Sequence, residues 1–77
     1  MSKEQKMIGY KKLASGVVNS NFTFEKKDEI LRRIEASVSK DWHDGLIDYK
    51  ENRDVVHYLF NARTVILKQK AALRYAA

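Results

Sequence analysis

Residues 54–69, DVVHYLFNARTVILKQ, place apolar side chains around most of a predicted helix. A helix on the surface of a globular protein usually carries a single apolar stripe that faces the core. At 100° per residue, the apolar positions of this stretch instead cover an arc of roughly 220°. The narrow strip that remains holds His57, Asn61, Thr64 and Lys68. We expect such a helix to be buried on nearly all sides.

This helix begins at a clear start signal. Asp48 and Glu51 have the spacing of a capping box, in which each side chain accepts a hydrogen bond from a backbone N–H of the other residue. No proline or glycine follows, so nothing in the sequence breaks the helix. We predict one long helix over residues 49–74, with a length of ~40 Å at about 1.5 Å per residue.

A first amphipathic helix is predicted over residues 3–18. Its apolar side chains cover roughly 140° of one face, the width typical of a helix that packs on a core. They are Met7, Tyr10, Leu13, Ala14, Val17 and Val18. The stretch NSNFTF (residues 19–24) is rich in Asn and Ser, which favour turns. A short extended run through residues 17–24 is the alternative.

A second amphipathic helix is predicted over residues 24–43. Thr23 is its expected N-cap, because the hydroxyl can accept a hydrogen bond from an unpaired N–H of the first turn. Gly45 can adopt the left-handed backbone conformation that ends a helix. The apolar stripe is about 120° wide. It consists of Phe24, Ile30, Leu31, Ile34, Val38 and Trp42.

The composition is that of one small helical domain. The chain has 77 residues, no proline, three glycines and no cysteine. Compact domains usually run from about 50 to 250 residues, and without cysteine no disulfide can support the fold. We therefore predict an all-α protein in which residues 1–77 form a single domain, with two shorter amphipathic helices packed on one long C-terminal helix.

The long helix exceeds what the two shorter helices can cover. A second copy of the chain is the simplest additional cover, because symmetric dimers are the commonest oligomers. We predict a homodimer whose interface is formed by the apolar residues of the long helix, namely Val55, Val56, Leu59, Phe60, Ile66 and Leu67. The alternative is a compact monomer in which the C-terminal part of the long helix stays partly exposed.

The sequence offers little to support catalysis. A catalytic zinc needs three converging ligands, but His43, Asp44, Asp48 and His57 show no HxxxH or HxxE spacing. Cysteine is missing, the serines stand in no triad-like context, and no glycine-rich phosphate loop is present. We predict a protein that is not an enzyme and that uses neither a metal nor a cofactor.

The charges are unevenly distributed along the chain. Residues 1–27 hold six lysines against two glutamates, residues 28–54 hold five bases against eight acids, and residues 55–77 hold four bases and no acid. An anionic partner would therefore meet the two ends of the chain. The predicted phosphate-binding residues are Lys3, Lys6, Lys11, Lys12, Arg63, Lys68, Lys70 and Arg74, with Tyr75 as a neighbour that could stack on a base.

Two functional hypotheses follow. The leading one is a small, basic, non-enzymatic protein that associates with nucleic acid through phosphate contacts in a regulatory or accessory role. The alternative is a protein-interaction module that regulates or inhibits a partner by docking through its apolar helix or through the acidic residues 41–54. Membrane binding is disfavoured, because basic groups interrupt the apolar arc. With no apolar run of membrane-spanning length and no secretory signal, we expect a cytoplasmic protein.

Overall fold

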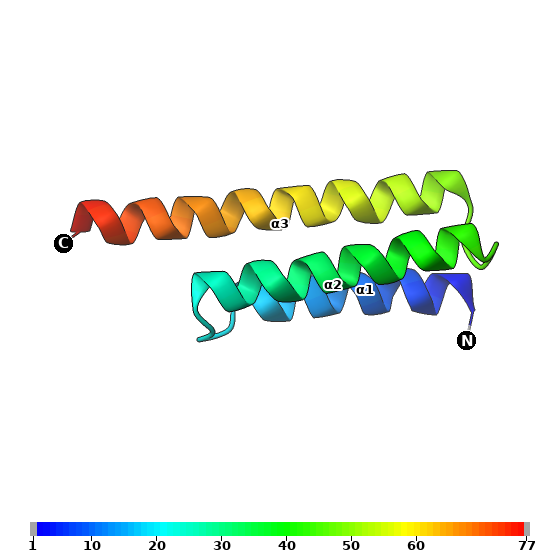
Figure 1. The fold of residues 1–77 in the computed structure, drawn as a ribbon, viewed down its shortest axis with the longest axis horizontal. Helices are drawn as coiled ribbons and strands as arrows, with labels where there is room; N and C mark the ends of the chain where they lie inside the picture. Colours follow the sequence, from blue (N-terminus) through cyan, green and yellow to red (C-terminus); the bar gives the residue numbers. More distant parts are fainter. Residues whose placement is uncertain (1, 77) are drawn as a thin grey trace.

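The computed structural model describes residues 2–76 of the chain, which fold into three packed helices and contain no strand. The helices are α1 (Lys3–Val18), α2 (Phe24–His43) and α3 (Tyr49–Ala76). Consecutive helices run antiparallel, so α1 and α3 point in the same direction (Figure 1). The all-α prediction is confirmed. The first two helices occupy the expected ranges, and α3 continues beyond residue 74.

Local signals set the helix ends. The Thr23 hydroxyl accepts a hydrogen bond from the Lys26 backbone N–H at 3.1 Å. Asp48 accepts one from the Glu51 N–H at 2.8 Å, and the Glu51 carboxylate accepts one from the Asp48 N–H at 2.9 Å. Gly45 has a φ of 76°, in the left-handed region that ends a helix. The predicted cap, capping box and stop signal are therefore confirmed.

The extended alternative for residues 17–24 is wrong. Val17 and Val18 form the last turn of α1, and α2 begins at Phe24. The Asn19 N–H donates to the Ser15 carbonyl at 3.0 Å, and the Ser20 N–H donates to the Val17 carbonyl at 3.2 Å. These bonds satisfy carbonyls that the end of a helix would otherwise leave unpaired, so the connection is a turn.

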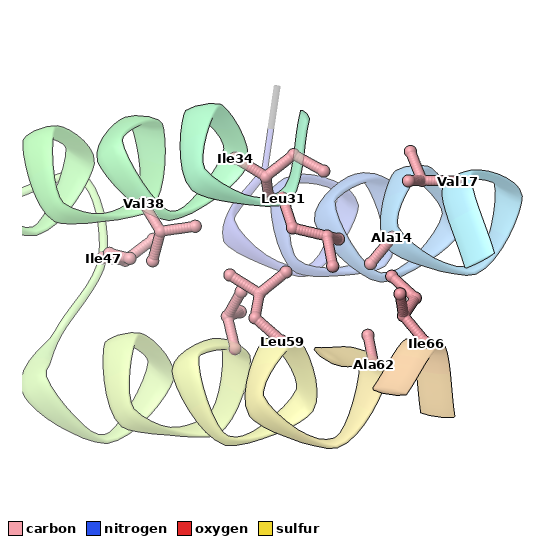
Figure 2. Packing of buried hydrophobic residues seen from close by; sticks show 10 residues of the cluster. Ala14, Val17, Leu31, Ile34, Val38, Ile47, Leu59, Ala62 and Ile66 are labelled. Atoms are coloured by element: carbon pink, nitrogen blue, oxygen red, sulfur yellow. The ribbon is translucent and has the colours of Figure 1, made fainter. Parts of the chain in front are cut away.

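The hydrophobic core lies along the space where the three helices meet (Figure 2). α3 contributes four buried residues at helical spacing, namely Val55, Leu59, Ala62 and Ile66. The other buried hydrophobic residues are Ala14 and Val17 of α1, Leu31, Ile34 and Val38 of α2, and Ile47 between α2 and α3. In a single chain, α1 and α2 thus cover one stripe of the apolar arc of α3, as expected from two helices too short to cover the whole arc.

Side-chain hydrogen bonds between different helices help to fix their relative positions. The Asp41 carboxylate on α2 accepts hydrogen bonds from the Tyr10 hydroxyl and, at 3.2 Å, from the Lys6 ammonium of α1. The hydroxyls of Ser15 on α1 and Tyr58 on α3 are 2.6 Å apart. These pairs join residues at least 31 positions apart in the chain, so they report tertiary structure that no local pattern contains.

The C-terminal part of α3 extends past the ends of α1 and α2 (Figure 1). α3 has 28 residues, whereas α1 has 16 and α2 has 20. Among residues 49–74 of α3, Ile66 is the last buried residue. Leu73, which continues the buried stripe, is 61% exposed. We refer to residues 68–76 as the α3 tail.

Candidate interaction surface

The side chains considered for metal binding or acid–base chemistry do not converge. His43 and Asp44 lie at the end of α2, Asp48 lies at the start of α3, and all three are exposed. His57 is also exposed, farther along α3. Among the residues that the structure describes, no group of three or more His, Cys, Asp or Glu side chains could hold a metal ion.

The N-terminal lysines lie mostly beside acids of the same chain. The Lys3 ammonium is 3.9 Å from Glu51, the Lys6 ammonium is 3.2 Å from Asp41, and the Lys11 ammonium is 3.6 Å from Asp54. Lys12 is exposed and forms no ion pair with a described side chain. Three of the four lysines that the sequence suggested for phosphate binding therefore have an intramolecular carboxylate partner.

The C-terminal bases also include some with an intramolecular ion pair and some without one. The Arg63 guanidinium lies 2.8 Å from Glu35 and 3.9 Å from Asp28 of α2. In contrast, Lys68, Lys70 and Arg74 are exposed and form no ion pair with a described side chain. The side chain of Tyr75 lies outside the described residues. Three of the five exposed bases of α3 without an ion pair to a described side chain therefore lie in the α3 tail, and the other two, Lys50 and Arg53, lie in its first two turns.

The two basic ends of the chain do not form one patch. The start of α1 and the α3 tail lie at opposite ends of the molecule (Figure 1), whose longest extent is 47 Å. Lys3 and Lys6 accompany the first of these ends, and Lys70 and Arg74 accompany the second. A single phosphate-binding surface made of all eight predicted residues is not assembled in one copy of the chain.

A line of exposed apolar side chains runs along α3. Phe60 and Leu67 are each 65% exposed, Tyr49 is 61% exposed and Val56 is 37% exposed. Their spacings of seven, four and seven residues place them on one narrow strip of the helix. This strip is turned by about 110° from the buried stripe. We refer to Tyr49, Val56, Phe60 and Leu67 as the outer stripe.

The six residues predicted for a dimer interface fall into a buried group and an exposed group. Val55, Leu59 and Ile66 are between 0% and 6% exposed, because they pack in the core of their own chain. Val56, Phe60 and Leu67 remain on the surface. The apolar arc of α3 therefore consists of two parts, one already covered by α1 and α2 and one without cover in a single copy.

Aromatic residues extend the outer stripe at its N-terminal end. The rings of Trp42 and Tyr49 lie 5.8 Å apart between centroids, so the apolar surface continues from α3 onto α2. Trp42 is 37% exposed, and Leu46 in the turn between the two helices is 46% exposed. Trp42 thus ends the α2 stripe at the edge of the core, where it is available to a partner.

At its other end the outer stripe borders a hollow between α2 and α3. The hollow has a volume of about 340 Å³. Phe24, Ile66 and Leu67 give it an apolar lining, while Asp28 and Arg63 stand among the charged groups around it. The surface therefore offers a projecting aromatic pair at one end and a recess at the other.

The spacing of the apolar residues in the sequence indicates this surface, but the predicted dimer interface left out one of its residues, Tyr49. Tyr49 stands seven residues before Val56, and Leu67 stands seven residues after Phe60. A spacing of seven residues is close to two helical turns and returns to the same face. Tyr49 belongs to the surface by that spacing, whereas the pairing of Trp42 with Tyr49 depends on the fold of the α2–α3 turn.

No family model, curated protein or solved structure matches this chain. Within residues 2–76, no helix has the length and apolar character needed to cross a membrane. The outer stripe and the charges beside it are therefore the features on which we base a function.

Proposed function

We propose that this chain is a small, non-enzymatic protein-interaction module and that the outer stripe of α3 is its docking surface. The exposure of Phe60 and Leu67, each 65%, on one strip with Tyr49 and Val56 is the observation that carries the proposal. Single exposed apolar residues are normal on a protein surface, but a contiguous group of them marks a contact surface. A helix that presents anchors at i, i+7 and i+11 suits recognition between helices or in a groove.

The charges favour a protein partner over nucleic acid. Four of the eight bases that the sequence suggested for phosphate contacts lie within 4 Å of carboxylates of the same chain, namely Lys3, Lys6, Lys11 and Arg63. Exposed aromatic and aliphatic anchors contribute little to phosphate binding but dominate the centres of protein interfaces. A module of this kind would act by occupying a surface of its partner, in a regulatory or inhibitory role.

The outer stripe also supports the self-association expected from the sequence, in a narrower form. The core of a single chain already buries three of the six residues predicted for the interface, namely Val55, Leu59 and Ile66. An interface between copies would then consist of Val56, Phe60 and Leu67, extended by Tyr49. Binding of another protein and binding of a second copy are both protein interactions through this one surface.

Nucleic-acid association is the second candidate function, and the α3 tail supports it. α3 contains no acid after Asp54, and Lys68, Lys70 and Arg74 are exposed without an ion pair to a described side chain. Three phosphate contacts on duplex DNA would give log affinity a slope of about −2.7 against log salt concentration. Weak, salt-sensitive binding of this kind would not require the outer stripe.

A site-specific crosslinking experiment tests the proposal. A photoreactive phenylalanine analogue replaces Phe60 in one variant and Ile8, which is 53% exposed on α1, in a matched control. Irradiation in cells should yield a discrete protein adduct from position 60 and none from position 8. Adducts of equal yield from both positions, or adducts of position 60 with nucleic acid only, would overturn the proposed function.

A further inference from the structure

We propose that the outer stripe is occupied by a second copy of this chain, docked antiparallel so that the two-fold axis passes between Val56 and Phe60. The inference rests on the proposed function, because it names the partner of the same surface. It commits to one occupant and one orientation, and both are argued from the spacing of the stripe and from the positions of the charges.

The outer stripe is symmetric in its spacing. The intervals from Tyr49 to Val56, to Phe60 and to Leu67 are seven, four and seven residues, so the sequence of intervals is the same in both directions. Two antiparallel copies then bring Val56 of one opposite Phe60 of the other. They also bring Tyr49 opposite Leu67. All four side chains of each copy therefore meet an apolar side chain, as a self-complementary two-fold interface requires.

The shape of the two ends fits this register. Leu67 borders the hollow lined by Phe24 and Ile66, with a volume of about 340 Å³. In the antiparallel arrangement the 61% exposed ring of Tyr49 from the second copy arrives at this hollow. A projecting aromatic side chain that enters an apolar recess is the usual form of an energetic anchor in an interface. The two-fold axis places this contact at both ends.

Charge distinguishes the antiparallel dimer from a parallel one. Because Leu67 faces Tyr49 of the second copy, the α3 tail extends past the start of the other copy's α3. There it meets the α2–α3 turn, residues 44–48, which carries the exposed carboxylates Asp44 and Asp48 and no base, while the exposed bases Lys50 and Arg53 follow in the first two turns of α3. The tail itself carries Lys68, Lys70 and Arg74 and no acid. The basic tail of each copy therefore lies against the acidic turn of the other.

A parallel dimer would place the two tails side by side. Their six bases would then repel one another without an acid between them, and like charges brought together at an interface cost affinity. The antiparallel dimer also gives the α3 tail a partner surface, including the half-exposed Leu46 of the second copy. The part of α3 that extends beyond α1 and α2 thus contacts the second copy in this dimer.

Charge exchange tests the orientation. In one variant, K68E and R74E change the net charge of the α3 tail from positive to negative. In the other variant, D44K and D48N change the net charge of the α2–α3 turn from negative to positive. Asparagine at position 48 keeps the capping function of that residue. Each variant alone places like charges in both tail–turn contacts. A one-to-one mixture restores opposite charges in both contacts of the mixed dimer. K12E, an exposed lysine on α1 without an ion pair to a described side chain, is the control reversal.

Sedimentation velocity at low salt should show wild-type and K12E dimers of equal affinity. Each exchange variant should dimerise at least about tenfold more weakly, since each homodimer carries several unfavourable contacts. The mixture should recover to within about threefold of the wild type. If both exchange variants dimerise like the wild type, or if mixing restores nothing, the antiparallel orientation is wrong.

The state of the wild-type chain separates this inference from the proposed function. If the wild type stays monomeric up to about 100 μM, a second copy is not the occupant. Crosslinking from position 60 to a different protein would in that case still support the proposed function. Absence of any protein adduct from position 60 would overturn both.

Discussion

Leu59 and Phe60 are adjacent on α3, yet the side chain of Leu59 is 2% exposed and that of Phe60 is 65% exposed. Successive residues of a helix point about 100° apart, so one enters the core while the other faces away from α1 and α2. This boundary divides the apolar arc of α3 into a part that holds the monomer together and a part that we assign to a partner.

The boundary predicts opposite effects for two substitutions. Leu59→Ala should lower the free energy of unfolding by about 2–4 kcal/mol, because it leaves a cavity in the core. Phe60→Ser should change it by less than about 0.5 kcal/mol, since its side chain is mostly in water, while removing self-association. Urea denaturation at protein concentrations below the dimer range measures both values. Equal destabilisation by the two variants would show that Phe60 is part of the folding core.

Lys27 is predicted to stabilise the end of α1. It is 5% exposed, and its ammonium donates hydrogen bonds to the Val18 carbonyl at 3.0 Å and to the Gln69 side-chain oxygen at 3.4 Å. Lys27→Ala removes these bonds and the buried side-chain packing, so we expect a loss of about 1–3 kcal/mol in the free energy of unfolding.

Lys26 provides the matched control for this substitution. It is the preceding residue, it is half-exposed, and it pairs only with Glu29 on the helix surface at 3.7 Å. Lys26→Ala should cost less than about 0.5 kcal/mol, as exposed ion pairs usually do. A thermal or urea unfolding series that gave the two alanine variants the same stability would contradict the structural role of Lys27.

Two glycines should respond in opposite directions to the same change. Gly45 has a φ of 76°, and a side chain in that conformation costs roughly 1–2 kcal/mol, so Gly45→Ala should destabilise the protein. Gly16 lies within α1, and an added Cβ would meet nothing within 4 Å. Gly16→Ala should therefore raise the free energy of unfolding by about 0.5–1 kcal/mol through higher helix propensity. Calorimetric melting temperatures of the two variants should move apart.

The structural features that can be predicted from the sequence are those that depend on residues close together in the chain. Thr23, Gly45 and the Asp48–Glu51 pair each act on backbone groups within three residues, so the helix ends can be located from local spacing. The apolar stripes likewise follow from the helical period alone. For these reasons the three helices are predictable from the amino-acid sequence by itself.

The features that escaped prediction depend on which helices become neighbours. Lys6 meets Asp41 across 35 positions of the chain, and Arg63 meets Glu35 across 28. These contacts give Lys6 and Arg63, two of the bases predicted to bind phosphate, a carboxylate partner in the same chain. Local sequence spacing does not predict such contacts. In the same way, periodicity shows that α3 is apolar over a wide arc, but only the positions of α1 and α2 decide that Val55 is covered and Val56 is not.

Ion pairing also sets an upper limit on phosphate binding by the eight bases predicted for it. Of the eight bases predicted for phosphate contacts, only Lys12, Lys68, Lys70 and Arg74 are exposed without an ion pair to a described side chain. These eight bases should therefore contribute a salt slope on duplex DNA no steeper than about −3.6, instead of about −7 if all of them contacted phosphate. Lys70→Gln should reduce the slope by about 0.9, because it removes one phosphate contact. Lys6→Gln should leave the slope unchanged, since Lys6 is held by Asp41. Fluorescence anisotropy titrations at several salt concentrations measure these slopes. A slope near −7 that decreases equally in both variants would show that the intramolecular ion pairs open on binding, and it would favour nucleic acid over protein as the partner.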